Sequence, residues 1–193
     1  MEIESNNPIQ VYVLDENQLK EICKVAGDAG ARRYKEEEKQ SQKRRADRRL
    51  HNTELLLRNY KALQLSVDNA IYTMRQLEEE ASTNEILNLM MDRDDDELIL
   101  QSVRASKAKT ILILKHIDNM LRLYRVYSDQ QGELDQRRYQ VLYDRYIAEP
   151  ALQIVPDITN KYYISKETAY NDLKIAKERL STLIFGVDGL PIS

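Results

Sequence analysis

The spacing of apolar residues predicts long helices over most of the chain. No proline or glycine occurs between residues 31 and 80, which favours one continuous helix there. In the second half of this stretch, apolar residues recur at alternating spacings of four and three. They are Leu56, Tyr60, Leu63, Val67, Ala70, Met74 and Leu77. This is the repeat of a heptad seam, which packs against a partner helix.

A second seam with the same alternation follows between residues 99 and 127. It consists of Ile99, Val103, Ser106, Thr110, Ile113, Ile117, Met120, Tyr124 and Tyr127, and Ile111, Leu114 and Leu121 widen it. A polar segment that ends in acidic residues, 81–96, separates the two seams. We therefore expect residues 31–130 to form a long antiparallel helical hairpin. The added width of the second stripe predicts that chains associate into a homo-oligomer, whose number of subunits the sequence does not fix.

The first 30 residues predict an N-terminal arm and a short helix. Residues 9–14 alternate like a strand, although an ordered arm or pairing with another chain explains them equally well. Asp15 and Gln18 have the spacing of an N-cap and its reciprocal partner. Leu19, Ile22, Cys23 and Ala26 form the apolar stripe of the helix that follows. Gly27 and Gly30 predict its end, or a weak point, near residue 30.

A compact module of three helices is expected at residues 134–186, after a break at Gly132. Its first helix covers residues 136–147, and Pro150 follows the end of that helix. Pro156 fits the first turn of a second, short helix, where a missing N–H costs nothing. Ser165 is placed to cap the third helix. That helix has apolar residues on its inner face at Ala169, Leu173, Ala176 and Leu180. The predicted fold is thus all-α, a hairpin followed by a helix-turn-helix module.

The outer face of the third helix of this module is polar and suits contact with double-stranded DNA. Small inner residues let such a helix lie close to its support, while outer side chains reach base edges in the major groove. Asn171 could read adenine, Lys174 guanine or a phosphate, and Thr168 a phosphate or a thymine methyl group. The candidate DNA-binding residues are Ser165, Lys166, Glu167, Thr168, Tyr170, Asn171, Lys174 and Lys177. The alternative is a plain three-helix bundle with a solvated polar face.

Residues 136–180 also resemble the promoter-reading fourth domain of primary bacterial sigma factors. The matching residues are Arg138, Val141, Leu142, Arg145 and Tyr146, then Ile158, Tyr162, Ile164, Ser165, Thr168 and Ala169, then Ala176 and Leu180. The chain departs from the pattern at Tyr163, where a turn glycine is usual, and at Asp157, where a glutamate is usual. The linker over residues 148–155 lacks the usual threonine. These departures affect the expected base preference more than the expected fold.

No second domain of a sigma factor is recognisable upstream, so the layout is not that of a complete sigma factor. A helical N-terminal region followed by a sigma-like module resembles the ArpU/RinA-type phage late-gene transcriptional regulators. This resemblance implies activation of phage packaging, structural or lysis genes, with RNA polymerase as a partner. Arg138 and Arg145 are the candidate polymerase contacts, on a face expected to lie away from Asn171 and Lys174.

The charge balance does not by itself indicate a nucleic-acid partner. The formal net charge is −3, with 29 Lys and Arg against 32 Asp and Glu. The distribution matters more, because residues 32–49 contain nine basic and only four acidic side chains. Candidate phosphate contacts in this run are Lys43, Arg44, Arg45, Arg48 and Arg49. A solvated helix with ion pairs one turn apart is an equally good explanation.

The remaining motifs argue against an enzyme, a cofactor and a metal. There is no glycine-rich phosphate loop, nucleophile elbow or pair of catalytic carboxylates. His51 and His116 lack partners at metal spacing, and the single cysteine, Cys23, cannot form an intramolecular disulfide. Residues 92–97 have alternating acids but no glycine at the sixth position of a calcium loop and no glutamate at the twelfth. We expect these acids to lie at the N-terminus of the following helix instead.

No secretory signal is evident, and the most apolar stretch, residues 111–114, is far too short to cross a bilayer. The sequence therefore predicts a cytoplasmic, DNA-binding transcriptional regulator. Two other interpretations remain open. One is the DNA-recognising small subunit of a phage packaging terminase, although there the DNA module usually comes first. The other is a helical adaptor that binds protein and not DNA.

Overall fold

The computed structural model describes residues 15–67 and 82–186, and every regular element within them is helical. The all-α prediction is therefore confirmed. The chain divides into two compact units, residues 1–41 and 42–193, which are described separately. The predicted strand at residues 9–14 lies outside the described residues, as do the seam residues Ala70, Met74 and Leu77.

The first helix, α1 (Glu16–Val67), begins at the predicted cap and contributes to both units. The Asp15 carboxylate accepts hydrogen bonds from the backbone N–H groups of Asn17 and Gln18, both at 2.8 Å. The Gln18 side chain accepts from the Asp15 N–H at 3.0 Å in return. The helix continues through Gly27 and Gly30, so the predicted end near residue 30 is wrong. A helical glycine costs only about 1 kcal/mol relative to alanine, which strong helix formers on both sides can offset.

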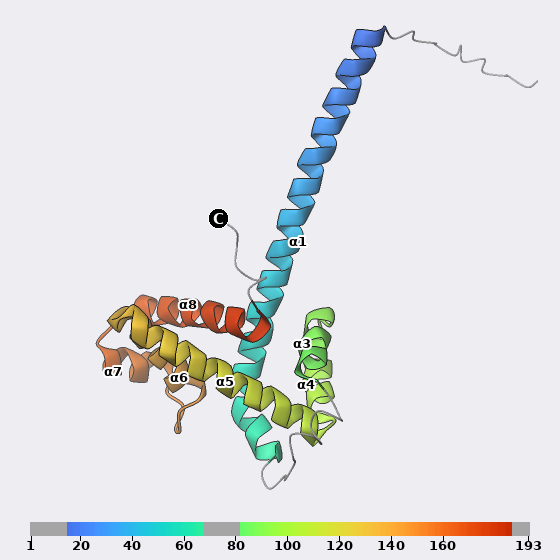
Figure 1. Ribbon diagram of the computed structural model, residues 1–193. Helices are drawn as coiled ribbons and strands as arrows, with labels where there is room; N and C mark the ends of the chain where they lie inside the picture. The colour runs from blue at the N-terminus through green and yellow to red at the C-terminus, as the bar shows by residue number, and fades with distance from the viewer. Residues whose placement is uncertain (1–14, 68–81, 187–193) are drawn as a thin grey trace, which may run out of the picture. The chain divides into compact units, whose positions relative to one another are not determined.

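In the second unit, three helices pack on one another and form most of the core (Figure 1). They are α5 (Lys107–Gln131), α6 (Glu133–Tyr146) and α8 (Lys166–Phe185). Ile113, Ile117 and Tyr124 of α5 are completely buried, as are Leu142 of α6 and Leu180 of α8. The wide apolar stripe of α5 is thus covered within one chain.

The predicted long hairpin is not formed by the described residues. The part of α1 in the second unit buries Leu56, Leu57 and Leu63, but α1 does not pack along the length of α5. The Tyr60 hydroxyl of α1 donates a hydrogen bond to the Asp118 carboxylate of α5. The prediction paired α5 with the helix that carries the first seam, which is α1. In the structure α5 pairs mainly with α6 and α8.

The second seam is also divided between two helices, α4 (Asp96–Arg104) and α5. Ser106 lies at a seam position but caps α5, with its Oγ 3.5 Å from the Lys109 backbone nitrogen. The Thr110 hydroxyl donates to the Val103 carbonyl at 3.0 Å across the break. Most of the seam residues on both sides are nevertheless buried, and Met120 and Tyr127 are partly buried, so the spacing identified the inner face but not the break.

The segment between the two seams contains a helix, α3 (Thr83–Asp92), that we did not predict. Ser82 and Glu85 form a capping box at its start, and Ile86 and Met90 are buried. Asp95 caps α4 by accepting from the N–H groups of Glu97 and Leu98 at 3.0 and 3.2 Å. The expected place at a helix N-terminus is confirmed for Asp95, Asp96 and Glu97, whereas Asp92 is the last residue of α3.

The C-terminal region has the three helical parts that the sequence predicted: α6, a short second part after it, and α8. Pro150 follows the end of α6, and a helical turn, η1 (Ile154–Ile158), leads into α7 (Thr159–Tyr162). Val155 has an extended backbone (φ −125°, ψ 128°), so Pro156 opens the helical part, as expected. Ile158 is completely buried, and Ile164 packs against the core from the turn before α8.

Tyr163, where the sigma pattern has glycine, adopts the left-handed conformation at the end of α7 (φ 52°, ψ 44°). The residue is 95% exposed. The backbone N–H of Ile164 reaches the Thr159 carbonyl at 3.1 Å, which closes the turn. The turn therefore keeps the left-handed backbone that glycine usually permits. The cost is steric strain, because Tyr163 has a side chain in this conformation.

Replacing Tyr163 with Gly is expected to leave the stability unchanged or raise it by up to about 1 kcal/mol. The left-handed conformation costs a residue with a side chain about 1–2 kcal/mol, and glycine avoids this cost but has more freedom when unfolded. Asn160→Gly in α7 is the matched control, because Asn160 is exposed and helical. It should lose about 0.5–1 kcal/mol. Urea denaturation checks both values, and equal losses in the two variants would contradict strain at Tyr163.

Candidate nucleic-acid interface

The N-terminus of α8 is fixed by local hydrogen bonds. The Ser165 Oγ accepts a hydrogen bond from the Thr168 backbone N–H at 3.1 Å, so the predicted cap is confirmed. The two hydroxyl oxygens of these residues lie 2.9 Å apart. Thr168 is half-buried and engaged with the cap. Ser165 and Thr168 therefore define where α8 begins.

The inner face of α8 is apolar and closely packed. Ala169, Leu173, Ala176 and Leu180 are buried as predicted, and Ile184 extends the same face. Small side chains at Ala169 and Ala176 let the backbone of α8 approach the helices beneath it. The inner face thus determines which side of α8 turns outward.

Five of the predicted DNA-binding residues are exposed together on the outer side of α8: Lys166, Glu167, Tyr170, Asn171 and Lys174. At about 100° per residue they occupy an arc of roughly 140° around the helix. The Lys166 ammonium lies 5.9 Å from the centre of the Tyr170 ring. The Lys174 ammonium lies 4.0 Å from the Glu178 carboxylate, an exposed contact that contributes little. We call these five residues the outer face of α8.

Lys177, also a predicted DNA contact, is placed differently. Its ammonium lies 2.6 Å from the Glu54 carboxylate of α1, and its side chain is mostly buried. Burial by itself raises the pKa of the Glu54 carboxyl, but hydrogen bonds and charge from Lys177 and Arg58 outweigh it and lower the pKa overall. Lys177 lies within the same arc, farther along α8, but its pairing with Glu54 ties α8 to α1 and leaves it mostly covered, unlike the five exposed residues.

The buried Asp144 carboxylate joins α6 to α7. It accepts hydrogen bonds from the Lys161 ammonium and the Tyr162 hydroxyl, both at 2.6 Å, and from the Gln140 amide at 3.1 Å. Burial, followed by the hydrogen bond to Asp144, raises the pKa of Tyr162. Since α7 is only four residues long, these contacts help to hold the turn before α8 in place.

A second buried carboxylate, Asp172, joins α6 to α8. Its oxygens lie 2.8 Å from the Arg137 Nε and 3.5 Å from the Arg138 Nε. Arg138 also lies 3.0 Å from the Asp135 carboxylate. Arg138, a predicted polymerase contact, is mostly buried and engaged with these two carboxylates, which supports a structural role. No signal in the sequence distinguished it from an exposed arginine.

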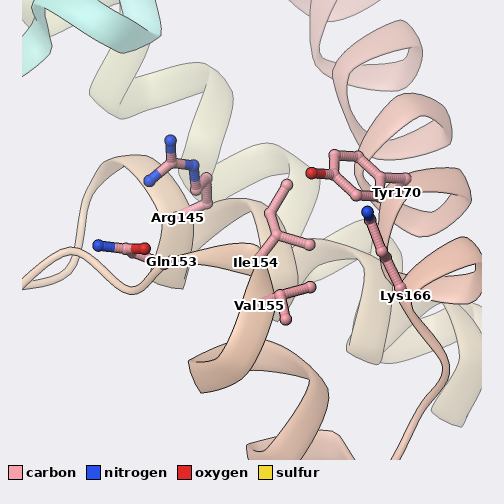
Figure 2. A pocket seen from close by; sticks show the side chains of 6 residues that line it. All are labelled: Arg145, Gln153, Ile154, Val155, Lys166 and Tyr170. Atoms are coloured by element: carbon pink, nitrogen blue, oxygen red, sulfur yellow. The ribbon is translucent and has the colours of Figure 1, made fainter.

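Arg145, the other predicted polymerase contact, lines a surface pocket beside the start of α8 (Figure 2). The pocket has a volume of about 340 Å³. Its lining residues are Arg145, Gln153, Ile154, Val155, Lys166 and Tyr170. Arg145 was expected to lie away from Asn171 and Lys174; neither of these residues lines the pocket, although Lys166 and Tyr170 of the same helix do. Sequence reasoning missed Gln153, because the segment between Pro150 and Pro156 has no periodic pattern.

The basic run separates into two groups. Lys43, Arg44 and Arg45 are exposed on α1. Arg48 donates to the Met91 carbonyl at 2.6 Å and pairs with Asp94, while Arg49 is buried. Arg48 therefore contacts the segment that follows α3, and Arg49 is buried, so neither is exposed like the other three.

Neither histidine lies in a cluster with metal-binding geometry. His51 contacts the Asp96 carboxylate at 2.7 Å, and the His116 Nε2 lies 2.9 Å from the Ile184 carbonyl oxygen. In the described part of the chain, no group of three or more His, Cys, Asp or Glu side chains could hold a metal ion. Among the described helices, none has both the length and the apolar character needed to cross a membrane.

No family model, curated protein or solved structure matches this chain.

Proposed function

We propose that the protein is a sequence-specific regulator of transcription that binds double-stranded DNA through a helix-turn-helix formed by α7 and α8. The observation that carries this proposal is the outer face of α8. It presents Lys166, Tyr170, Asn171 and Lys174 to solvent, directly after a tight turn. Long polar side chains on an exposed helix that stands on a buried apolar face match the needs of major-groove reading.

Within the outer face, each side chain has a distinct chemical role. Asn171 can make paired hydrogen bonds to adenine, and Lys174 can donate to guanine or to a phosphate. Glu167 can accept from the amino group of cytosine. Lys166 and Tyr170 are closest to the pocket beside α8 and so to the edge of the interface. Lys43, Arg44 and Arg45 remain candidate phosphate contacts on α1.

The resemblance to sigma-like phage regulators supports activation as the direction of regulation, with RNA polymerase as partner. Arg138 adds nothing to that part of the proposal, because Asp135 and Asp172 already engage it. The small subunit of a packaging terminase is distinguished by the site it binds. Mapping the bound DNA across the source genome should find promoters for a regulator and a packaging site for a terminase.

Changing both Asn171 and Lys174 to Ala should remove sequence preference while the fold persists. The preferred site is first selected from a random duplex library with the full chain. Losing one good base contact costs about 1–3 kcal/mol, so affinity for that site should fall about ten- to a hundredfold. Binding to random duplex should change much less, because phosphate contacts provide most of that affinity.

The matched control is Asn119→Ala, which removes an exposed asparagine amide from α5. It should leave both affinities unchanged. Circular dichroism confirms that each variant keeps its helicity. If the wild-type chain selects no sequence from the library, the proposed function is wrong. If it does but the double variant discriminates as well as the wild type, the reading face is elsewhere.

A further inference from the structure

The pocket beside α8 is lined by two cationic side chains from separate parts of the chain. Arg145 comes from the end of α6 and Lys166 from the first position of α8, and they lie on opposite sides of Ile154 (Figure 2). Tyr170 and Gln153 add a hydroxyl and an amide, which can donate hydrogen bonds. None of the six residues that line it in the described part of the chain is acidic.

Local contacts position these groups. One nitrogen of the Arg145 guanidinium, Nη1, lies 3.3 Å from the Leu152 carbonyl oxygen, and the guanidinium carbon lies 5.8 Å from the centre of the Tyr146 ring. The Asp157 carboxylate does not line the pocket, and it accepts a hydrogen bond from the Gln153 backbone N–H at 2.9 Å. Lys166 lies in the first turn of α8, where the helix dipole also favours an anion.

This donor set suits a phosphate group. A guanidinium offers a planar set of N–H donors that matches phosphate oxygens, and an ammonium adds a compact charge. Tyr170 belongs both to the pocket and to the outer face of α8. A DNA strand that borders a groove occupied by α8 would therefore pass over the pocket.

We propose that this pocket binds one phosphate of the DNA backbone and thereby sets the register of α8 in the major groove. The proposal rests on the proposed function and assigns Arg145 to DNA rather than to polymerase. Arg145 and Lys166 contact the same phosphate from two sides, and Tyr170 donates its hydroxyl. Phosphate contacts of this kind fix the orientation of a reading helix without specifying a base.

The test measures the affinity of the full chain for a labelled random duplex of about 30 base pairs across a range of KCl concentrations. The proteins are wild type, Arg145→Gln, Lys166→Gln and the double variant. One neutralised phosphate contributes about 0.9 to the slope of log affinity against log salt. We expect each single variant to reduce the slope and the double variant to reduce it by about 0.9 in total. A shared phosphate makes the two changes less than additive.

Arg93→Gln is the control, since Arg93 is exposed in the loop after α3 and the change in charge is the same. It should leave the slope unaltered. A double variant that loses about 1.8 from the slope has two separate phosphate contacts, which overturns the single-phosphate pocket. If Lys166→Gln and the double variant both keep the wild-type slope of log affinity against log salt, the pocket binds no phosphate. That result overturns the pocket proposal and leaves the proposed function standing. Failure of the wild type to bind any duplex rejects the proposed function, and the pocket with it.

Discussion

Replacing Ile117 with Ala is expected to destabilise the second unit by about 2–5 kcal/mol without changing the number of chains in the particle. Truncating a buried isoleucine loses its transfer free energy and leaves a cavity. Ile117 is completely buried in the described chain, on the stripe that α6 and α8 cover. The sequence predicted that the same stripe joins separate chains. The two explanations differ in how stability depends on protein concentration.

Thermal unfolding of wild type and Ile117→Ala, at two concentrations about a hundredfold apart, separates these explanations. If the stripe is internal, neither melting temperature depends on concentration through this site. Leu123→Ala is the matched control on α5, because Leu123 is 53% exposed, and it should change stability by no more than about 0.5 kcal/mol. A variant that unfolds more easily only at low concentration would show that the stripe joins chains.

Replacing Asp172 with Ala is expected to cost about 3 kcal/mol and to loosen α8 from α6. Removing one member of a buried ion pair leaves the other charge uncompensated, which costs about 3–5 kcal/mol. The value should fall at the lower end, because the Arg137 side chain is 31% exposed and can regain water. Asp172 itself is only 2% exposed. Urea denaturation measures the loss.

Glu178→Ala removes an exposed acid from the same helix and serves as the control for Asp172→Ala. Its contact with Lys174 is at 4.0 Å on the surface, so the cost should stay below about 1 kcal/mol. Asp172→Asn should fall between the two, because the amide oxygen can still accept a hydrogen bond from Arg137. Similar losses in Asp172→Ala and Glu178→Ala would contradict a buried role for Asp172.

Much of the secondary structure followed from residues close together in the sequence. Asp15 with Gln18 and Ser165 with Thr168 form the predicted caps, because a cap needs only a side chain and the N–H groups of the next turn. Ser82 and Glu85 have the same signal, and attention to it would have found α3. Ser106 could be taken either as a seam residue or as a cap. The structure uses it as a cap.

The inner face of α8 was also evident from the sequence, since Ala169, Leu173, Ala176 and Leu180 recur with the helical period. From this face it follows that Asn171 and Lys174 point outward. The periodicity could not show that Lys177 meets Glu54, because the two residues are 123 positions apart. A charged residue at the edge of a polar face gives no sign of which distant carboxylate it will meet.

The sequence by itself determined that the described part of this protein is all-helical, where several of its helices begin and which faces of α5 and α8 are buried, but not that the apolar stripe from Leu19 to Ala26 is exposed. These properties depend on the spacing and capping of residues that are close in the sequence, and such local features are the same whatever the tertiary packing. Only the tertiary structure decided that α5 pairs with α6 and α8 rather than with α1. It also placed Arg138 against Asp172, and Arg145 in the lining of the same pocket as Lys166. Similar apolar stripes can pack against any partner of matching shape, and similar charges can meet any opposite charge. The choice among partners therefore depends on how the whole core packs together.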